Sequence, residues 1–137
     1  MTMTAAEMRQ LMSNYDGGSL VRYRHDRQTR FVFTEGVLAV IEKAQANWLL
    51  DLLAYEFAPV IKKSFLKDGT MLVQVKLSVA ADQKSSRVSM VVAGTTQVLH
   101  TDNIGFTTFP HGDWYFYIYP CQEGDTFFCQ MILLDEY

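Results

Sequence analysis

The stretch Asn47–Phe57, NWLLDLLAYEF, constrains the fold more than any other part of the chain. After Asn47 only Asp51 and Glu56 are polar, so apolar side chains occupy most of the circumference of a helix with this sequence. A helix of this kind belongs in the middle of a small domain, where other elements can cover it. We therefore expect the remaining elements to pack around this helix.

The composition is typical of a folded chain with one core. Of the 137 residues, 49% are apolar and 20% are charged, which argues against disorder. No apolar run is long enough for a transmembrane helix, and the N-terminus lacks the basic and apolar regions of a secretory signal. Cys121 and Cys129 are too few for a disulfide framework. We expect a single cytoplasmic domain over residues 1–137, without membrane contact and without a cofactor.

The N-terminal region carries a helix signal. Thr4 and Glu7 have the spacing of a capping box, and Met8, Leu11 and Met12 would share one side of the helix that follows. The glycines of Asp16-Gly17-Gly18 are suited to ending it. The pattern predicts a helix within residues 1–18.

A second helix is expected directly before the apolar one. Thr34 is placed to cap it, with Glu35 near its positive end. A break at residues 45–47 would separate the two helices, and Pro59 is expected to end or kink the second. The sequence thus predicts a helical pair over residues 34–62.

Segments with a two-residue period of apolar side chains indicate strands. The predicted strands are residues 20–25, 30–34, 71–79, 88–92, 96–100, 114–119 and 127–134. We expect a loop at residues 102–112 and a β-meander over residues 70–134. Helices followed by a series of strands predict an α+β fold, in which an antiparallel sheet has two or three helices packed over one face.

Charge is unevenly distributed along the chain. Four of the twelve basic residues are Arg22, Arg24, Arg27 and Arg30, which we term the arginine cluster. From His100 onward there is no Lys or Arg, but there are six acids: Asp102, Asp113, Glu123, Asp125, Asp135 and Glu136. The arginine cluster could lie against this acidic third of the chain or form a basic patch for an outside partner. The sequence leaves both readings open.

Three blocks and one later strand form a recognisable pattern: Tyr23-Arg24-His25, Thr34-Glu35-Gly36-Val37, Trp48-Leu49-Leu50-Asp51 and Val75-Lys76-Leu77. This pattern resembles a small bacterial family known only as a domain of unknown function. The resemblance runs from about Tyr15 to the end of the chain and does not include the segment around Cys121 and Cys129. Members of that family occur largely in bacteria, phages and mobile elements. The resemblance implies an accessory protein of a mobile element and brings no known activity.

Asp51 is the most notable candidate for a chemical role, because a carboxylate in an apolar helix needs a partner if it is buried. An arginine of the arginine cluster is the expected partner, which would make Asp51 structural. The alternative is a general acid or base. A nucleophile–base set of His25, Asp51 and Cys121 or Cys129 can be drawn, but no motif supports it. We expect no enzymatic activity.

The sequence offers no metal-binding motif. His25, His100 and His111 are widely spaced and fall on different predicted elements. They lack the short spacings that place several ligands around one ion. We therefore predict no metal site.

The aromatic strand at residues 114–119 gives the clearest interaction signal. Trp114, Phe116 and Ile118 alternate with Tyr115, Tyr117 and Tyr119, so the tyrosines would share the face opposite the core. Tyrosine is enriched at protein interfaces. The acids Asp113, Glu123 and Asp125 would border this face. The alternative is a tyrosine ladder packed on neighbouring strands or covered by a helix.

We therefore expect a binding protein, most simply a phage or mobile-element accessory factor that contacts a host protein or protein complex. A concrete version is an inhibitor of a bacterial defence complex of the CRISPR type, in which carboxylates take the places of phosphates in a nucleic-acid-binding groove. A homodimer is a further option. Nucleic-acid binding through the arginine cluster ranks second, and a small enzyme that uses Asp51 and His25 ranks third.

Overall fold

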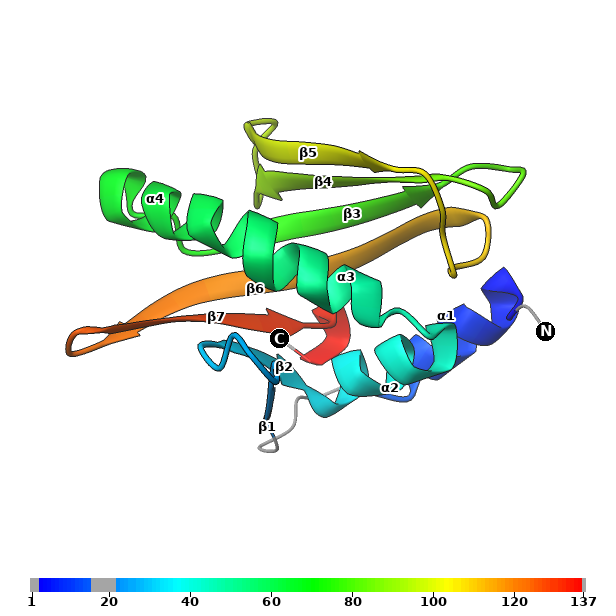
Figure 1. The fold of residues 1–137 in the computed structure, drawn as a ribbon, viewed down its shortest axis with the longest axis horizontal. Coiled ribbons are helices and arrows are strands. Elements are labelled where there is room, and N and C mark those ends of the chain that lie inside the picture. The colour runs from blue at the N-terminus through cyan, green and yellow to red at the C-terminus, as the bar shows by residue number, and fades with distance from the viewer. Residues whose placement is uncertain (1–2, 16–21, 137) are drawn as a thin grey trace.

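The computed structural model describes residues 3–15 and 22–136 and shows one mixed sheet with helices packed against it (Figure 1). The helices are α1 (Ala5–Ser13), α2 (Glu35–Ala44), α3 (Asn47–Leu52) and α4 (Ala58–Asp68), with a π-helical turn at Leu53–Phe57 and a 3-10 turn at Leu134–Glu136. The strands are β1 (Arg22–Arg24), β2 (Phe31–Thr34), β3 (Val73–Val79), β4 (Ser86–Val92), β5 (Val98–Ile104), β6 (Gly112–Glu123) and β7 (Thr126–Ile132). The predicted α+β fold is confirmed.

The seven strands lie in the order β1-β2-β7-β6-β3-β4-β5. Every neighbouring pair is antiparallel except β2 and β7, which run parallel. The C-terminal strands do not form a simple meander, because β6 returns to pair with β3 and leaves β5 at the edge. β5 also continues to Ile104, into the predicted loop, since its residues pair with β4 as far as Ser86.

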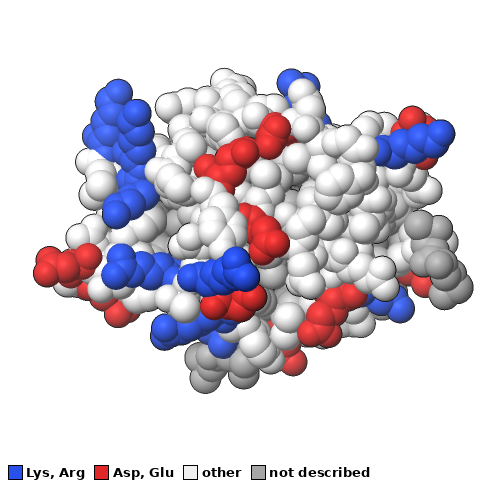
Figure 2. Space-filling view, in the orientation of Figure 1, with Lys and Arg blue, Asp and Glu red and all other residues white. Residues whose placement is uncertain are grey.

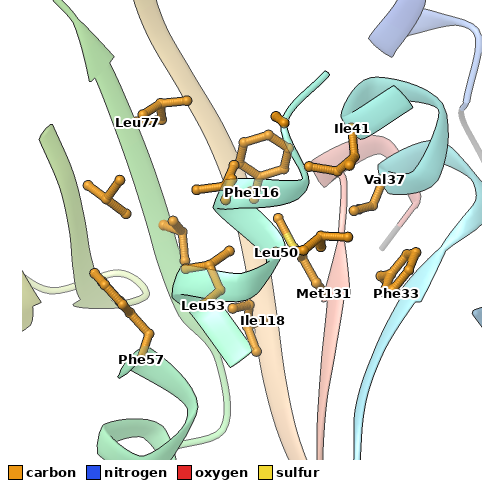
Figure 3. Packing of buried hydrophobic residues seen from close by; sticks show 14 of the residues in the cluster. Phe33, Val37, Ile41, Leu50, Leu53, Phe57, Leu77, Phe116, Ile118 and Met131 are labelled. Carbon is orange, nitrogen blue, oxygen red and sulfur yellow. The ribbon is translucent and has the colours of Figure 1, made fainter. Parts of the chain in front are cut away.

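The core lies between the helices and one face of the sheet (Figure 3). The alternation predicted for β3 and β6 is present: Val73, Val75, Leu77 and Val79 are buried on β3, as are Trp114, Phe116 and Ile118 on β6. Leu50 and Leu53 of the helical layer point toward these strands (Figure 3). Burial of this apolar area is the main force that holds helices and sheet together.

The predicted helix starts are confirmed. Thr4 and Glu7 form the capping box of α1, and the side chain of Thr34 accepts a hydrogen bond from the Val37 amide at the start of α2. The break between the helices falls at Gln45, which ends α2 in a left-handed conformation with φ of 52°. The predicted helix end at Asp16-Gly17-Gly18 and residues 20–21 of the first predicted strand lie outside the described residues.

The helix that contains Asp51 does not stop at Pro59. The chain passes through the π-helical turn, in which the Ala58 amide bonds to the Leu53 carbonyl, and continues as α4 to Asp68. Pro59 has no N–H for the carbonyl four residues earlier, and the wider turn before it accommodates this loss. The helix is also not enclosed on all sides, because Tyr55 is 46% exposed.

No helix in the described part of the chain is long and apolar enough to cross a membrane.

The C-terminal Glu136 closes the fold by binding the start of α2. Its buried carboxyl group accepts hydrogen bonds from the Thr34 hydroxyl, from the Gly36 amide at 3.2 Å and from the Leu133 amide at 3.0 Å. A carboxylate is favoured at the positive end of a helix. Two blocks separated by about a hundred residues thereby share one hydrogen-bonded cluster.

Candidate functional site

The alternating burial along β6 puts its three tyrosines on the sheet face opposite the buried Trp114, Phe116 and Ile118. Tyr115 is 39% exposed, and Tyr117 and Tyr119 are half-buried. The helices α2, α3 and α4 lie in front of the other face of the sheet (Figure 1), and Trp114 and Phe116 are buried in the core. We call the side that carries the tyrosines the tyrosine face.

Sheet pairing gives each tyrosine a polar neighbour from another strand. Lys76 lies opposite Tyr115 in the ladder, and Gln74 opposite Tyr117 donates a hydrogen bond to its hydroxyl at 2.9 Å. Gln130 lies opposite Tyr119, and its amide is within hydrogen-bond distance of the Tyr119 hydroxyl. These neighbours come from segments far away in sequence, so inspection of residues 114–119 alone could not find them.

The tyrosine face is hollowed next to Tyr119. A depression of about 540 Å³ is lined by Arg22, Met71, Tyr119, Pro120, Cys121, Ile132 and Glu136. Arg22, predicted as part of a separate basic patch, thus lies beside a residue of the predicted partner surface. A depression with a cation and apolar walls can receive a side chain of a partner.

The predicted acids flank the tyrosine face at its two ends. Asp113 precedes Tyr115 and pairs with Lys76 at 3.8 Å, whereas Glu123 and Asp125 lie at the β6–β7 hairpin. Arg87 is in register with Ser78, which is itself opposite Asp113, so it also points to this side. The face therefore carries charges of both signs and is not a purely acidic surface.

The arginine cluster is divided between two sides of the molecule. Arg22 and Arg24 alternate with Tyr23 on β1, and Arg22 reaches the tyrosine face. Arg30 instead lines a groove beneath α4, on the helix side. Among the described residues, Arg24, Arg27 and Arg30 form no ion pair with an acid. The cluster does not form one continuous patch.

Asp51 pairs with a histidine, and the predicted arginine partner is wrong. Nε2 of His25 lies 2.7 Å from Oδ1 of Asp51, and the aspartate side chain is 60% exposed whereas the histidine side chain is 4% exposed. Nδ1 of His25 accepts hydrogen bonds from the amides of Arg27 and Gln28. Two donors at Nδ1 assign the proton to Nε2, which therefore donates to Asp51.

This arrangement places both ring nitrogens of His25 in hydrogen bonds within the fold. A general base needs one nitrogen oriented by a partner and the other directed at the substrate or nucleophile. In His25, Nδ1 accepts from amides of the β1–β2 turn, and Nε2 donates to Asp51 of α3. The pair joins the β1–β2 turn to α3.

The cysteines are also poor nucleophiles. Burial raises the pKa of the Cys129 thiol to about 12, with a smaller contribution from Cys121, and burial together with Glu123 raises the pKa of Cys121. The thiolate is the reactive form of cysteine, so both side chains stay in the inert form near neutral pH. Of the set drawn from the sequence, His25 thus has both ring nitrogens in hydrogen bonds, and the thiols of Cys121 and Cys129 have raised pKa values.

Replacing Asp51 by Ala is expected to lower the free energy of unfolding by about 1–2 kcal/mol, because the buried Nε2–H loses an acceptor that is itself partly hydrated. Asp51→Asn keeps an acceptor oxygen and should cost less. Urea denaturation of the three proteins gives the comparison. A loss as large as that of a core deletion would contradict the exposed position of Asp51.

The remaining histidines do not gather into a metal site. His100 of β5 contacts Glu56 at 3.0 Å, and His111 lies near the start of α1. Within residues 3–15 and 22–136, no group of three or more His, Cys, Asp or Glu side chains is placed to hold a metal ion.

Comparison with known proteins identifies the family. Searches of curated proteins and of solved structures found no match. A model of a family of unknown function, DUF6876, matches residues 7–137, which confirms the kind of family that the sequence pattern resembles. The fold and the tyrosine face described above are thus those of a member of this family: the chain belongs to the family of unknown function DUF6876.

Proposed function

We propose that this protein is a binding protein and that the tyrosine face is its partner surface. The observation that carries the proposal is the position of Tyr115, Tyr117 and Tyr119 on the side of the sheet opposite α2–α4. Tyrosine offers a large amphipathic contact area at a low cost in side-chain entropy. Strand pairing on both sides of β6 holds the three side chains on a rigid base.

A protein is the favoured partner. The polar neighbours Gln74 and Gln130 supply hydrogen-bonding groups beside the rings, and Lys76 is already paired with Asp113. A surface of aromatic rings with polar neighbours of mixed charge has the composition of a protein interface. In keeping with a phage or mobile-element accessory factor, the partner would be a host protein. One version is a defence complex of the CRISPR type whose basic groove receives Asp113, Glu123 and Asp125.

We further propose that the protein acts by binding and not by catalysis. Both ring nitrogens of His25 are engaged, and Cys129 is buried with a raised pKa. These groups therefore serve the fold. The activity of the protein lies in the complex that it forms.

Nucleic-acid binding is the second candidate, because the structure adds cations to the tyrosine face. Arg22, Lys76 and Arg87 reach this side from three other strands. Tyrosines next to cations can stack bases. The two candidates differ in salt dependence, since binding to duplex DNA weakens with a log–log slope of about −0.9 for each phosphate neutralised. We expect no salt-sensitive nucleic-acid binding at low micromolar concentration.

Co-purification from the host with Tyr115→Ala and Tyr117→Ala variants tests the proposal. Each change should weaken partner binding by about 2 kcal/mol or more if the ring is an interface hot spot. Tyr55→Ala is the matched control, because Tyr55 is 46% exposed and lies on the helix side. Folded tyrosine-face variants that bind as well as the control would exclude this face. Recovery of nucleic acid in place of a protein would favour the second candidate, and self-association lost in the same variants would identify a homodimer.

A further inference from the structure

A groove on the helix side has the features of a small-molecule site. It lies between the helical layer and the neighbouring strands β2 and β7, on the opposite side of the sheet from the tyrosine face, and has a volume of about 310 Å³. Its lining residues are Gln28, Arg30, Phe31, Ala54, Ala58, Pro59, Lys62, Phe127 and Cys129. Ligand sites in proteins range from about 300 to 1,000 Å³, so the volume fits a small ligand.

The chemistry of the groove is divided between an apolar floor and a cationic rim. Phe31 and Phe127 are buried and form the floor, while the exposed Arg30 and Lys62 stand at the rim. Within the described chain neither cation has an acidic partner, and Lys62 lies over the Phe127 ring at 5.8 Å. Basic side chains gather on the half of this face that holds α4 and the β1–β2 hairpin (Figure 2).

Both walls of the groove are fixed by the fold. The turn that carries Gln28 and Arg30 is held by His25, which accepts from the Gln28 amide and donates to Asp51, and by the Arg30 carbonyl, which accepts from the Cys129 amide at 3.0 Å. The opposite wall is built from Ala54 in the π-helical turn and from the first residues of α4. Alanines at this position leave the space open, and π-helical turns are frequent at functional sites.

We propose that this groove binds a small amphipathic anion, a single hydrocarbon chain with a carboxylate or phosphate head. The apolar floor would bury the chain, and Arg30 and Lys62 would bind the head with charge-assisted hydrogen bonds. Two unpaired cations at one rim favour an anion over a neutral ligand. The volume of the groove favours a single hydrocarbon chain over a folded protein segment. In this proposal the His25–Asp51 pair positions the turn that carries Arg30.

Calorimetric titration of the protein with decanoate tests the proposal, with decanol as the neutral match. We expect decanoate to bind and decanol to bind at least about tenfold more weakly. Arg30→Gln/Lys62→Gln should lose about tenfold in decanoate affinity. Arg27→Gln/Lys63→Gln removes the same charge from neighbouring positions that do not line the groove, and should bind as the wild type does. Ala58→Leu fills the groove and should abolish binding without a change in unfolding temperature.

Several results would overturn this assignment. Absence of decanoate binding would do so, as would equal binding of decanol. An equal loss of decanoate affinity in the two double variants would mean that binding depends on the net charge of the protein and not on Arg30 and Lys62. Binding retained in folded Ala58→Leu would place the ligand elsewhere. Binding of anionic phosphatidylglycerol vesicles or of an acidic Asp/Leu peptide, without binding of decanoate, would assign the cations to a membrane surface or to a protein partner.

Discussion

Replacement of Glu136 by Ala is expected to lower the free energy of unfolding by about 3–5 kcal/mol, because it removes the acceptor of three hydrogen bonds at a buried site. The Thr34 hydroxyl and the amides of Gly36 and Leu133 all donate to this carboxyl group. A buried donor left without an acceptor costs about 1–3 kcal/mol. Urea denaturation measures the loss. Glu123→Ala, at an exposed acid of the β6–β7 hairpin, is the control and should stay within about 0.5 kcal/mol of the wild type.

The same cluster explains the glycine after Thr34-Glu35. A Cβ atom on Gly36 would lie 2.8 Å from the carboxyl atoms of Glu136, closer than such atoms approach. Gly36→Ala should therefore displace the carboxyl group and be destabilising, and its effect should shrink in a protein that already carries Glu136→Ala. If the two changes were additive, or if Glu136→Ala left stability unchanged, the Glu136 side chain would not be bound at the start of α2.

Phe57→Ala is expected to cost about 3–5 kcal/mol, the usual range for a buried phenylalanine. Phe57 is fully buried at the end of the π-helical turn, and its ring meets His100 of β5 edge-on with centroids 4.7 Å apart. The residue thus attaches the helical layer to the edge strand of the sheet. Tyr55→Ala, in the same turn but 46% exposed, should cost less than about 1.5 kcal/mol. Similar losses in the two variants would contradict the orientation of the turn.

Local signals in the sequence were sufficient for much of the fold. The caps at Thr4 and Thr34 depend on side chains and amides within three residues, so a short window contains all the participants. The alternation in β3 and β6 depends only on the two-residue period of a strand, which also placed the three tyrosines of β6 on one side. Pro59 was predicted to end or kink the helix, and the end does not occur, because the π-helical turn before Pro59 accommodates its missing N–H.

Contacts between distant segments account for what the sequence did not predict. The acceptor for His25 could not be assigned, because nothing in residues 20–34 indicates which turn of the central helix the β1–β2 turn will meet. The cations on the tyrosine face were also missed. Lys76 reaches Tyr115 only through the pairing of β3 with β6, and strand order depends on the whole chain. Residues 100–137 contain no Lys or Arg, but in the fold basic side chains from other strands lie beside them. The surface around the tyrosines is therefore less acidic than the sequence of this segment indicates.

The tyrosine rings themselves provide the most direct test of the proposed partner surface. Ring-labelled tyrosine gives separate NMR signals for side chains on the two sides of the protein, and the co-purified partner can be titrated into the labelled sample. The proposal predicts that the signals of Tyr115, Tyr117 and Tyr119 shift or broaden while that of Tyr55, on the helix side, does not change. A shift of Tyr55 with the three β6 tyrosines unchanged would contradict it and move the partner to the helical side of the molecule.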